Sequence, residues 1–417
     1  MRNSLFGITA LSLMGSTAWA ETTIDWLHLQ AVPEYVAIME DAASEFEAMH
    51  PDVTIQLQFL ENEAYKAKLP TLLQSDAAPD IFYSLGGGTF VEQQQAGVLR
   101  SIDDVDLGET LSNLGPAAVN AYTLDGELYG LAESVVYAGL WVNKSLIADA
   151  GVTLEELETW DGFLGAVQKL KDAGVTPIAM GGLDRWPAHF YWSYLVIRLA
   201  GQDAFQAAER GESPGFAGPG FVEAGEKFLD LVRLEPFQDG YLAADYNKSA
   251  GFFGDGKAAF HLQGTWNLGV ARNESATGEG LTDDNMAFLA FPAVEGGAGR
   301  ADDTLGGING WVFHKDAPDI AVQFGAYLET AGVQQRFAAA GAHIPLVAGG
   351  SDTTESEFLR AAAQRVAKAQ WHAIFFDQQL GADVGSVVND VSAELSDQSI
   401  SAEEAAAIVQ EAWEDNL

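Results

Sequence analysis

Alternating and periodic hydrophobic positions near the start of the chain predict strands and helices in turn. Apolar and polar residues alternate over 23–29 and 53–59, which favours two half-buried strands. Apolar residues recur at helical spacing over 33–49 and again over 64–74, and a short apolar strand follows at 80–84. Strands that alternate with helices indicate an α/β fold with mostly parallel sheets.

This architecture nominates binding positions before any motif is considered. In open sheets of parallel strands, ligands bind in crevices beyond the carboxyl ends of the strands. The loops that follow Leu29 and Ser84 are therefore expected to face a ligand.

The first twenty residues have the pattern of a secretory signal. A basic start, an apolar run over 5–14 and the sequence Ala18-Trp19-Ala20 predict cleavage after Ala20. The run is too short to span a bilayer. The chain has no cysteine, so we expect no lipid anchor at the cleavage site, no disulfide and no thiolate metal site. A free protein in a bacterial periplasm fits best.

Length and charge limit the class of protein further. Without the signal, 397 of the 417 residues remain, which suggests two domains. The chain carries 60 acidic and 21 basic residues, for a net charge of −39. A strongly anionic surface excludes nucleic acid and anionic membranes as partners, because both require positive charge. The charge also disfavours an anionic ligand.

Short segments along most of the chain resemble a known family, the extracellular solute-binding proteins of carbohydrate ABC importers, which includes maltose-binding protein. Their order and spacing over about 300 residues make the resemblance specific to the family, although not to one sugar. The matching segments are 78–81, 96–99, 129–131, 140–146, 159–163, 176–179, 264–266, 306–310, 321–328, 341–345 and 401–406.

The resemblance implies a two-lobed periplasmic binding protein fold that closes on its ligand. It implies two mixed, mostly parallel sheets flanked by helices, with a hinge crossed three times, near Leu131, Thr304 and Leu346. The expected N-terminal lobe comprises 21–131 and 305–346, and the expected C-terminal lobe comprises 132–304 and 347–417. The implied partners are a carbohydrate and the membrane permease subunits of an importer, and we expect a monomer.

A sugar site needs planar aromatic rings for its C–H faces and polar groups for its hydroxyls. Trp266 follows an apolar strand and resembles the family's cleft aromatic, and Trp371 lies in a segment that often forms a cleft wall in the family. Trp186 and His189 are placed to face the cleft from a helix that Pro187 opens. The other tryptophans singled out are expected to pack in the interior: Trp141, Trp160, Trp192, Trp311 and Trp413.

Polar candidates follow the first two strands. His28 and Gln30 end the first strand, in a loop that contributes to sugar sites in the family. A lone histidine is more often structural, so both roles stay open for His28. Glu61 follows the second strand, where its carboxylate either accepts hydroxyl hydrogen bonds or is simply solvated.

The loop after the third strand departs from the family pattern. Ser84, Gly86 and Gly87 occupy positions where maltose-binding protein carries an aromatic residue and an aspartate. This difference argues against maltodextrin specificity. Glycines here either let backbone N–H groups approach a ligand or only form a turn.

The remaining candidates come from the expected hinge crossings, which the family places at the cleft floor. Asp377 is a further candidate, in the same segment as Trp371. The candidates at the crossings are Glu133, Ser134, Gly306, Gly307 and His343.

Enzyme motifs are weak in this sequence. Residues 211–215 match G-x-S-x-G, but a charged helical run at 207–210 precedes them, whereas a nucleophile elbow follows a strand. No H-E-x-x-H, P-loop or dinucleotide motif occurs, so neither a metal nor a cofactor is expected. Two alternatives stay open: a binding protein for a polyamine, metal or organic anion, and a secreted glycosidase with paired carboxylates.

Overall fold

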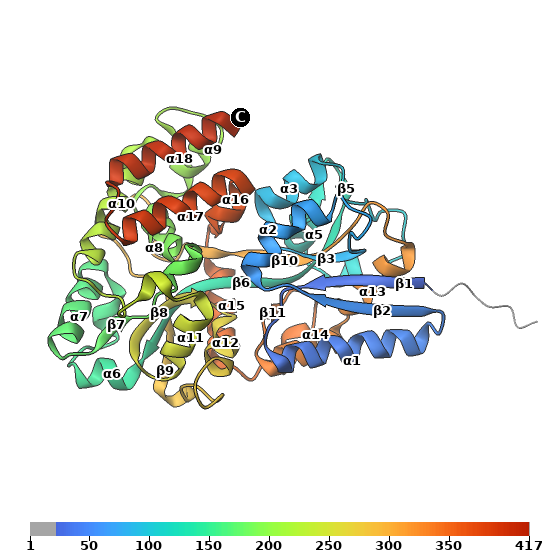
Figure 1. Cartoon of the computed structure of the whole chain (residues 1–417), viewed down its shortest axis with the longest axis horizontal. Coiled ribbons are helices and arrows are strands. Elements are labelled where there is room, and N and C mark those ends of the chain that lie inside the picture. The colour runs from blue at the N-terminus through green and yellow to red at the C-terminus, as the bar shows by residue number, and fades with distance from the viewer. Residues whose placement is uncertain (1–21, 417) are drawn as a thin grey trace, which may run out of the picture.

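The computed structural model describes residues 22–416, so the expected signal and its cleavage site lie outside the described residues. The chain folds into two α/β halves side by side (Figure 1). The first half begins with the elements that the hydrophobic pattern predicted. These are β1 Thr22–His28, α1 Pro33–Met49, β2 Val53–Phe59, α2 Asn62–Leu72 and β3 Ile81–Ser84.

Local sequence explains these first elements. Pro33 stands at the first position of α1, where its missing N–H has no helical partner to lose. Tyr35, Met39 and Phe46 lie on one face of the helix and are buried. Side chains spaced three, four or seven residues apart share a helix face, so this pattern attaches α1 to the sheet.

All strands except β4 and β5 belong to one mixed sheet. Hydrogen bonds join the strands in the order β2-β1-β3-β10-β6-β8-β7, while β9 and β11 pair with β6, and β12 pairs with β10. The bounds are β4 Thr123–Leu124, β5 Glu127–Leu128, β6 Gly130–Asn143, β7 Thr176–Ile178, β8 Ala258–Gly264, β9 Met286–Leu289, β10 Thr304–Phe313, β11 Ile344–Pro345 and β12 His372–Ile374. Strands β4 and β5 form a separate hairpin.

The expected α/β class is confirmed, but the sheet is not mostly parallel, since β6 pairs antiparallel with β8, β9 and β10, and β10 pairs antiparallel with β3. β1 runs parallel to β2 and β3, and β7 runs parallel to β8, as the alternation predicted. The strands of the two halves nevertheless form one continuous hydrogen-bonded path instead of two sheets. The reason is that β10 pairs with β3 through 310–313 and with β12 through 304–306, so it serves both halves.

Helices cover the sheet on both sides (Figure 1). In the first half these are α1 and α2, given above, together with α3 Gly87–Gln95, α4 Thr110–Asn113, α5 Pro116–Ala121, α13 Asp319–Leu328 and α14 Ala331–Ala340. In the second half they are α6 Lys144–Asp149, α7 Trp160–Asp172, α8 Trp186–Leu199, α9 Gly201–Glu209, α10 Pro219–Val232, α11 Tyr246–Gly254, α12 Asn267–Asn273, α15 Glu357–Lys368, α16 Phe376–Gln379, α17 Ala382–Ser396 and α18 Ala402–Asn416. Short 3₁₀ helices lie at Glu155–Glu158, Gly182–Asp184, Gly215–Ala217, Tyr241–Ala243, Asp283–Asn285 and Gly350–Thr353.

Each half has its own hydrophobic core, and β6 and β10 pass between them. Leu131 of β6 belongs to the first core, and Val136 belongs to the second. Leu305 of β10 belongs to the second core, and Trp311 belongs to the first. Leu346 packs against the first core and against a third, smaller cluster in the second half. These changes of core support the expected hinge crossings, and we propose the lobe boundaries on this basis.

The tryptophans expected to pack do so. Trp160 stands beside Thr159, whose side chain accepts the N–H of Gly162 and caps α7. Trp413 is half-buried against the second core. The fully buried ones are Trp141, Trp160, Trp192 and Trp311. None of the helices within residues 22–416 combines the length and apolar character that a bilayer crossing requires.

Candidate ligand-binding site

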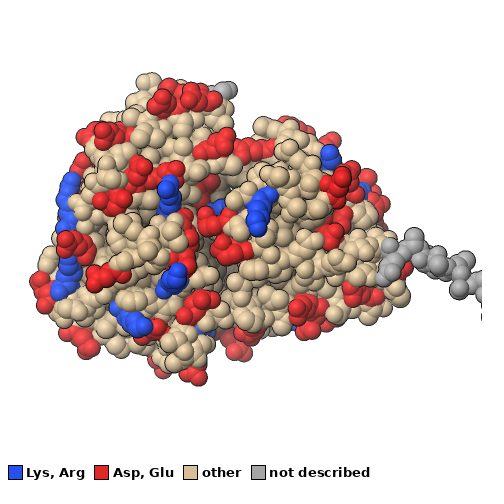
Figure 2. Space-filling view, viewed as in Figure 1, with Lys and Arg blue, Asp and Glu red and all other residues tan. Residues whose placement is uncertain are grey.

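A cavity of about 170 Å³ lies between the two halves. The space-filling view shows a recess there, with acidic residues around it (Figure 2). The cavity is lined by Leu29, Gln30, Ala31, Val32, Phe59, Glu61, Asn62, Lys66, Tyr83, Leu85, Ser134, Val136, Asp184, Trp186, Phe190, Tyr246, Asn247, Trp266, Val270, Asn309, Ala342, His343, Phe375, Asp377 and Gln378.

The first half supplies its wall mainly from the ends of strands. Gln30, Glu61 and Leu85 follow β1, β2 and β3, which is where parallel strands were expected to present ligand-binding loops. The second half supplies helix starts instead, at α8, α11, α12 and α16. The cavity therefore exists only where the two halves come together.

Aromatic rings form much of the wall. Trp186 and Phe190 are one turn apart on α8, so they share a face. Trp266 lies at the start of α12, and its ring centroid is 5.9 Å from that of Phe375 and 6.3 Å from that of Trp186. Phe375 in turn stacks on Phe190 at 4.9 Å. These contacts hold the rings in fixed orientations, so a flat apolar face of a ligand meets a preformed surface.

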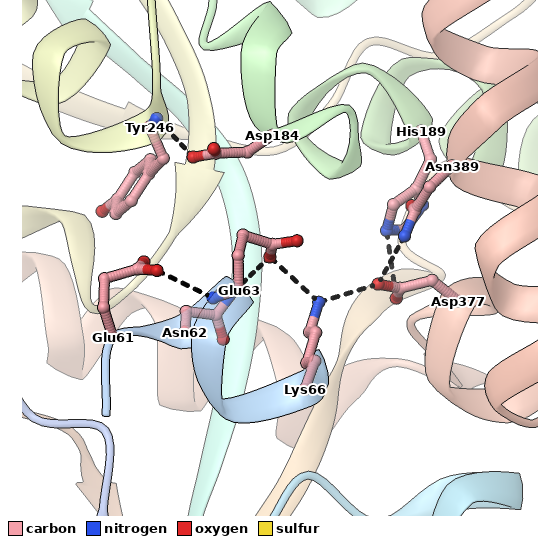
Figure 3. A network of polar contacts seen from close by, with 9 residues as sticks. All are labelled: Glu61, Asn62, Glu63, Lys66, Asp184, His189, Tyr246, Asp377 and Asn389. Atoms are coloured by element: carbon pink, nitrogen blue, oxygen red, sulfur yellow. Dashed lines mark hydrogen bonds and ion pairs between the residues drawn. The ribbon is translucent and has the colours of Figure 1, made fainter. Parts of the chain in front are cut away.

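Two carboxylates face the cavity from opposite halves (Figure 3). Glu61 caps α2 and accepts the backbone N–H of Glu63 at 2.9 Å. Asp184 accepts the backbone N–H of Tyr246 at 2.7 Å. Burial raises the pKa of Asp184 and the nearby charge of Glu61 adds to the shift, against the effect of the hydrogen bond from Tyr246.

A third carboxylate, Asp377, joins three elements (Figure 3). Its Oδ2 lies 3.4 Å from Lys66 Nζ of α2 and 3.3 Å from Asn389 Nδ2 of α17. Its Oδ1 lies 3.2 Å from His189 Nε2 of α8. Burial by itself would raise the pKa of Asp377, but His189 and Lys66 hold it well below the ordinary value. Asp377 is therefore an ionised, fixed group at the cavity wall.

Seven of the residues nominated from sequence line this cavity. His343 is one of them, and burial lowers its pKa to about 3, so its ring is neutral. Its Nε2 lies 2.9 Å from Gln334 Oε1, which only accepts, so the ring proton is on Nε2. The seven are Gln30, Glu61, Ser134, Trp186, Trp266, His343 and Asp377.

Other nominated residues lie next to the cavity without lining it. His28 faces a neighbouring hollow, and its Nδ1 accepts the N–H of Gln30 at 3.2 Å. His189 is fully buried behind Asp377. Ser84 is buried, and its carbonyl accepts the hydroxyl of Tyr122 at 3.1 Å.

The nominated glycines serve close packing. A Cβ on Gly86 would lie 2.8 Å from the carbonyl oxygen of Ile308, and Gly86 has a φ of 73°. A Cβ on Gly306 would lie 2.0 Å from the carbonyl oxygen of Val136. Glycine is required at both positions because backbone approaches backbone. A Cβ on Gly87 would lie 2.9 Å from the carbonyl oxygen of Gln378, whereas a Cβ on Gly307 would be in ordinary contact, 3.5 Å from Gln378 Oε1.

Trp371 and Glu133 lie further from the cavity. Trp371 packs into the second core, with its ring 5.6 Å from that of Phe205. Glu133 is buried beneath the cavity floor, beside Tyr83 and Trp311. Burial raises the pKa of Glu133 to about 7, and these two neighbours offset the shift only in part.

Glu133 has an acidic neighbour, Glu329, at the end of α13. Glu329 is 1% exposed, and neither of its carboxyl oxygens has a hydrogen-bond partner. Burial, together with the charge of Glu133, raises the pKa of Glu329 well above the ordinary value. Glu133 and Glu329 therefore place two carboxyls near the point where β6 leaves the first core and enters the second.

Sequence reasoning missed several lining residues. Phe190 carries a usable signal, because it lies one turn after Trp186 on the same helix face. Phe375 stands between two nominated residues, Trp371 and Asp377. The sequence contains no comparable signal for Lys66, Asp184 or Tyr246, because their neighbours in space are distant in the chain. Lys66 and Asp377, for example, are 311 positions apart.

The enzyme motifs remain coincidental. Helix α9 ends just before the G-x-S-x-G match at 211–215, and a 3₁₀ turn follows, so the strand that an elbow requires is missing from this position. Among residues 22–416, no group of three or more histidine, aspartate or glutamate side chains is arranged to hold a metal ion.

Two α/β halves with an aromatic cavity between them are the arrangement expected of a two-lobed solute-binding protein. A family model for bacterial extracellular solute-binding proteins matches residues 31–335, and the chain belongs to this family. Members of the family are exported or periplasmic proteins. The resemblance seen in the sequence is thereby confirmed at the level of this family.

Curated relatives include several proteins named for sugars. A multiple sugar-binding protein of Streptococcus mutans is 23% identical over 73% of this chain and 70% of its own length. A maltotriose-binding protein of Pyrococcus abyssi is 26% identical over 60% of this chain and 50% of its own length. The chain spans about half the length of several of these relatives, the maltotriose-binding protein among them.

Solved structures share the fold over nearly the whole chain. A chitin oligosaccharide binding protein superposes with a TM-score of 0.86 at 24% identity, covering 95% of this chain and 99% of the other. A bacterial solute receptor described as exclusive for β-D-galactopyranose superposes with a TM-score of 0.81 at 19% identity, covering 95% and 98%.

Proposed function

We propose that this protein is the substrate-binding component of an ABC importer and binds a carbohydrate in the cavity between its halves. The observation that carries the proposal is the aromatic wall. Seven aromatic side chains line the cavity beside three carboxylates and several amides. Rings that accept C–H faces and polar groups that bond hydroxyls are the combination that a sugar requires. The sugar names of several relatives support the same class of ligand.

The charges at the cavity argue against an organic anion. Lys66 is the one cation among the described residues that line the cavity, and Asp377 and Glu63 already lie 3.4 and 3.7 Å from its Nζ. Three lining carboxylates would repel an anionic ligand in a site of low dielectric constant. The predominance of rings over carboxylates favours a sugar over a polyamine.

The protein performs no chemistry in this proposal. The first twenty residues direct export to the periplasm and are removed after Ala20. The halves rotate about the crossings in β6 and β10, close on the sugar, and present the closed form to the membrane permease.

A thermal-shift screen tests the ligand class. The mature protein is heated with single monosaccharides and oligosaccharides, and with putrescine and citrate for the two other solute classes. A sugar at 100 times its dissociation constant should stabilise the protein by about 2.7 kcal/mol and raise its melting temperature. A shift with putrescine or citrate alone contradicts the proposal. Release of reducing ends from an oligosaccharide identifies a glycosidase instead.

Small-angle scattering tests the closure. A saturating sugar should lower the radius of gyration, because the halves rotate as rigid bodies about β6 and β10. The forward scattering gives the mass, for which we expect one mature chain. An unchanged radius of gyration despite bound sugar indicates a rigid site and removes the hinge from the proposal.

A further inference from the structure

We propose that the closed cavity receives a single sugar ring without negative charge, and that the contact between Lys66 and Asp377 is the wall that ends the site. This inference rests on the proposed function and names the kind of sugar. It is supported by the size of the cavity, by the contacts that border it and by the charges of its lining.

The cavity is the size of one ring. Its volume is about 170 Å³. An engineered protein cavity of about 150 Å³ holds one benzene molecule, which is a single six-membered ring. Close packing at protein density leaves no space beside such a ring for a second one joined to it. The second ring of a disaccharide would therefore have to lie outside this volume.

Contacts between the halves border the cavity. Lys66 of α2 meets Asp377 of α16. α1 meets α12, because a Cβ on Gly269 would lie 2.1 Å from the hydroxyl oxygen of Tyr35. α3 meets α16, because a Cβ on Gly88 would lie 2.5 Å from the carbonyl oxygen of Gln379. In Figure 1 these helix pairs border the junction above and below the sheet.

The two residues of the Lys66–Asp377 contact differ in how firmly they are held. Asp377 is fixed within its own half by His189 and Asn389, and its side chain is 5% exposed. Lys66 comes from the other half, and its side chain is 31% exposed. Closure therefore brings a long side chain against a preformed acceptor (Figure 3). Shortening Lys66 removes the wall without removing a core residue.

The lining carboxylates determine which charge a bound sugar ring can carry. Glu61 and Asp184 each accept a backbone N–H and keep further lone pairs free for hydroxyls. Lys66 does not offset them for a ligand, because it is engaged by Asp377. A neutral or aminated ring is accommodated, whereas a uronate places a further negative charge beside those of Glu61 and Asp184.

Titration calorimetry on the mature protein tests the length of the ligand. The probes are three pairs: glucose with cellobiose, galactose with lactose, and xylose with xylobiose. At least one monosaccharide should bind about tenfold or more tightly than its disaccharide. Glucuronate and galacturonate should bind more weakly than the matching neutral sugar.

Variants of α2 then test the wall. Lys66→Ala should reduce the preference for the single ring, whereas Lys68→Ala, at an exposed position on the same helix, should preserve it. Lys66→Met keeps an unbranched side chain of similar bulk and should also preserve most of it. Circular dichroism verifies that each variant is folded.

The outcomes separate this inference from the proposed function. A disaccharide that binds as tightly as its monosaccharide, or Lys66→Ala with an unchanged preference, overturns the inference and leaves the proposed function standing. A uronate that binds as tightly as its neutral sugar overturns the assignment of charge. If no sugar binds, both the proposed function and the inference are wrong.

Discussion

Replacing Trp266 with alanine should weaken sugar binding about 5- to 150-fold, which corresponds to roughly 1–3 kcal/mol from lost stacking and apolar burial. Trp266 lines the cavity, and its ring meets those of Trp186 and Phe375. The indole also lies against Gly264, where a Cβ would come within 2.0 Å of the ring. Its orientation is therefore fixed before a ligand arrives. Titration calorimetry on the folded variant measures the effect.

Trp413→Ala is the matched control. Trp413 is also half-buried, with its ring 5.7 Å from that of Phe216, but it stands on α18 and does not line the cavity. This variant should lower stability and leave affinity unchanged. If a folded Trp266→Ala protein binds its sugar as tightly as the parent, Trp266 only packs and the assigned cavity wall is incorrect.

Replacing Glu329 with glutamine should raise the free energy of unfolding at pH 8 by roughly 1–3 kcal/mol, because the amide removes the cost of burying a carboxyl that is ionised in the unfolded chain. Burial raises the pKa of Glu329, and raises that of Glu133 from 4.5 to about 7. A raised pKa means that the folded chain holds protons that the unfolded chain releases. The contribution to stability is therefore complete below pH 4.5 and is lost as the pH rises through the folded pKa.

Denaturant unfolding at pH 5 and pH 8 checks this prediction. Between pH 5 and pH 8, Glu329→Gln should gain stability relative to the parent, since the amide mimics the protonated carboxyl at both values. Glu411→Gln, at an exposed position on α18, should follow the parent. Equal pH dependence in Glu329→Gln and the parent shows that the buried pair does not control stability.

The local pattern of the chain was sufficient for the first five elements, β1, α1, β2, α2 and β3. The alternation in β1 and the helical period of α1 depend on neighbours a few residues away, so a single sequence displays them. The same holds for the ends of β1 and β2, where Gln30 and Glu61 were nominated and now line the cavity. Trp266 was identifiable because it follows an apolar strand.

Only the tertiary structure decided which distant groups meet. β6 and β10 join the halves in one hydrogen-bonded path, and this path brings α2 of the first half against α16 of the second. Trp371 resembled a cleft residue but packs inside the second core. Lys66 and Asp377 are ordinary residues in sequence, and their contact arises because two separately folded cores place their surfaces within reach across the cavity. Hydrophobic periodicity specifies which face of an element is buried, whereas the partner across a cleft depends on how whole cores are positioned relative to each other.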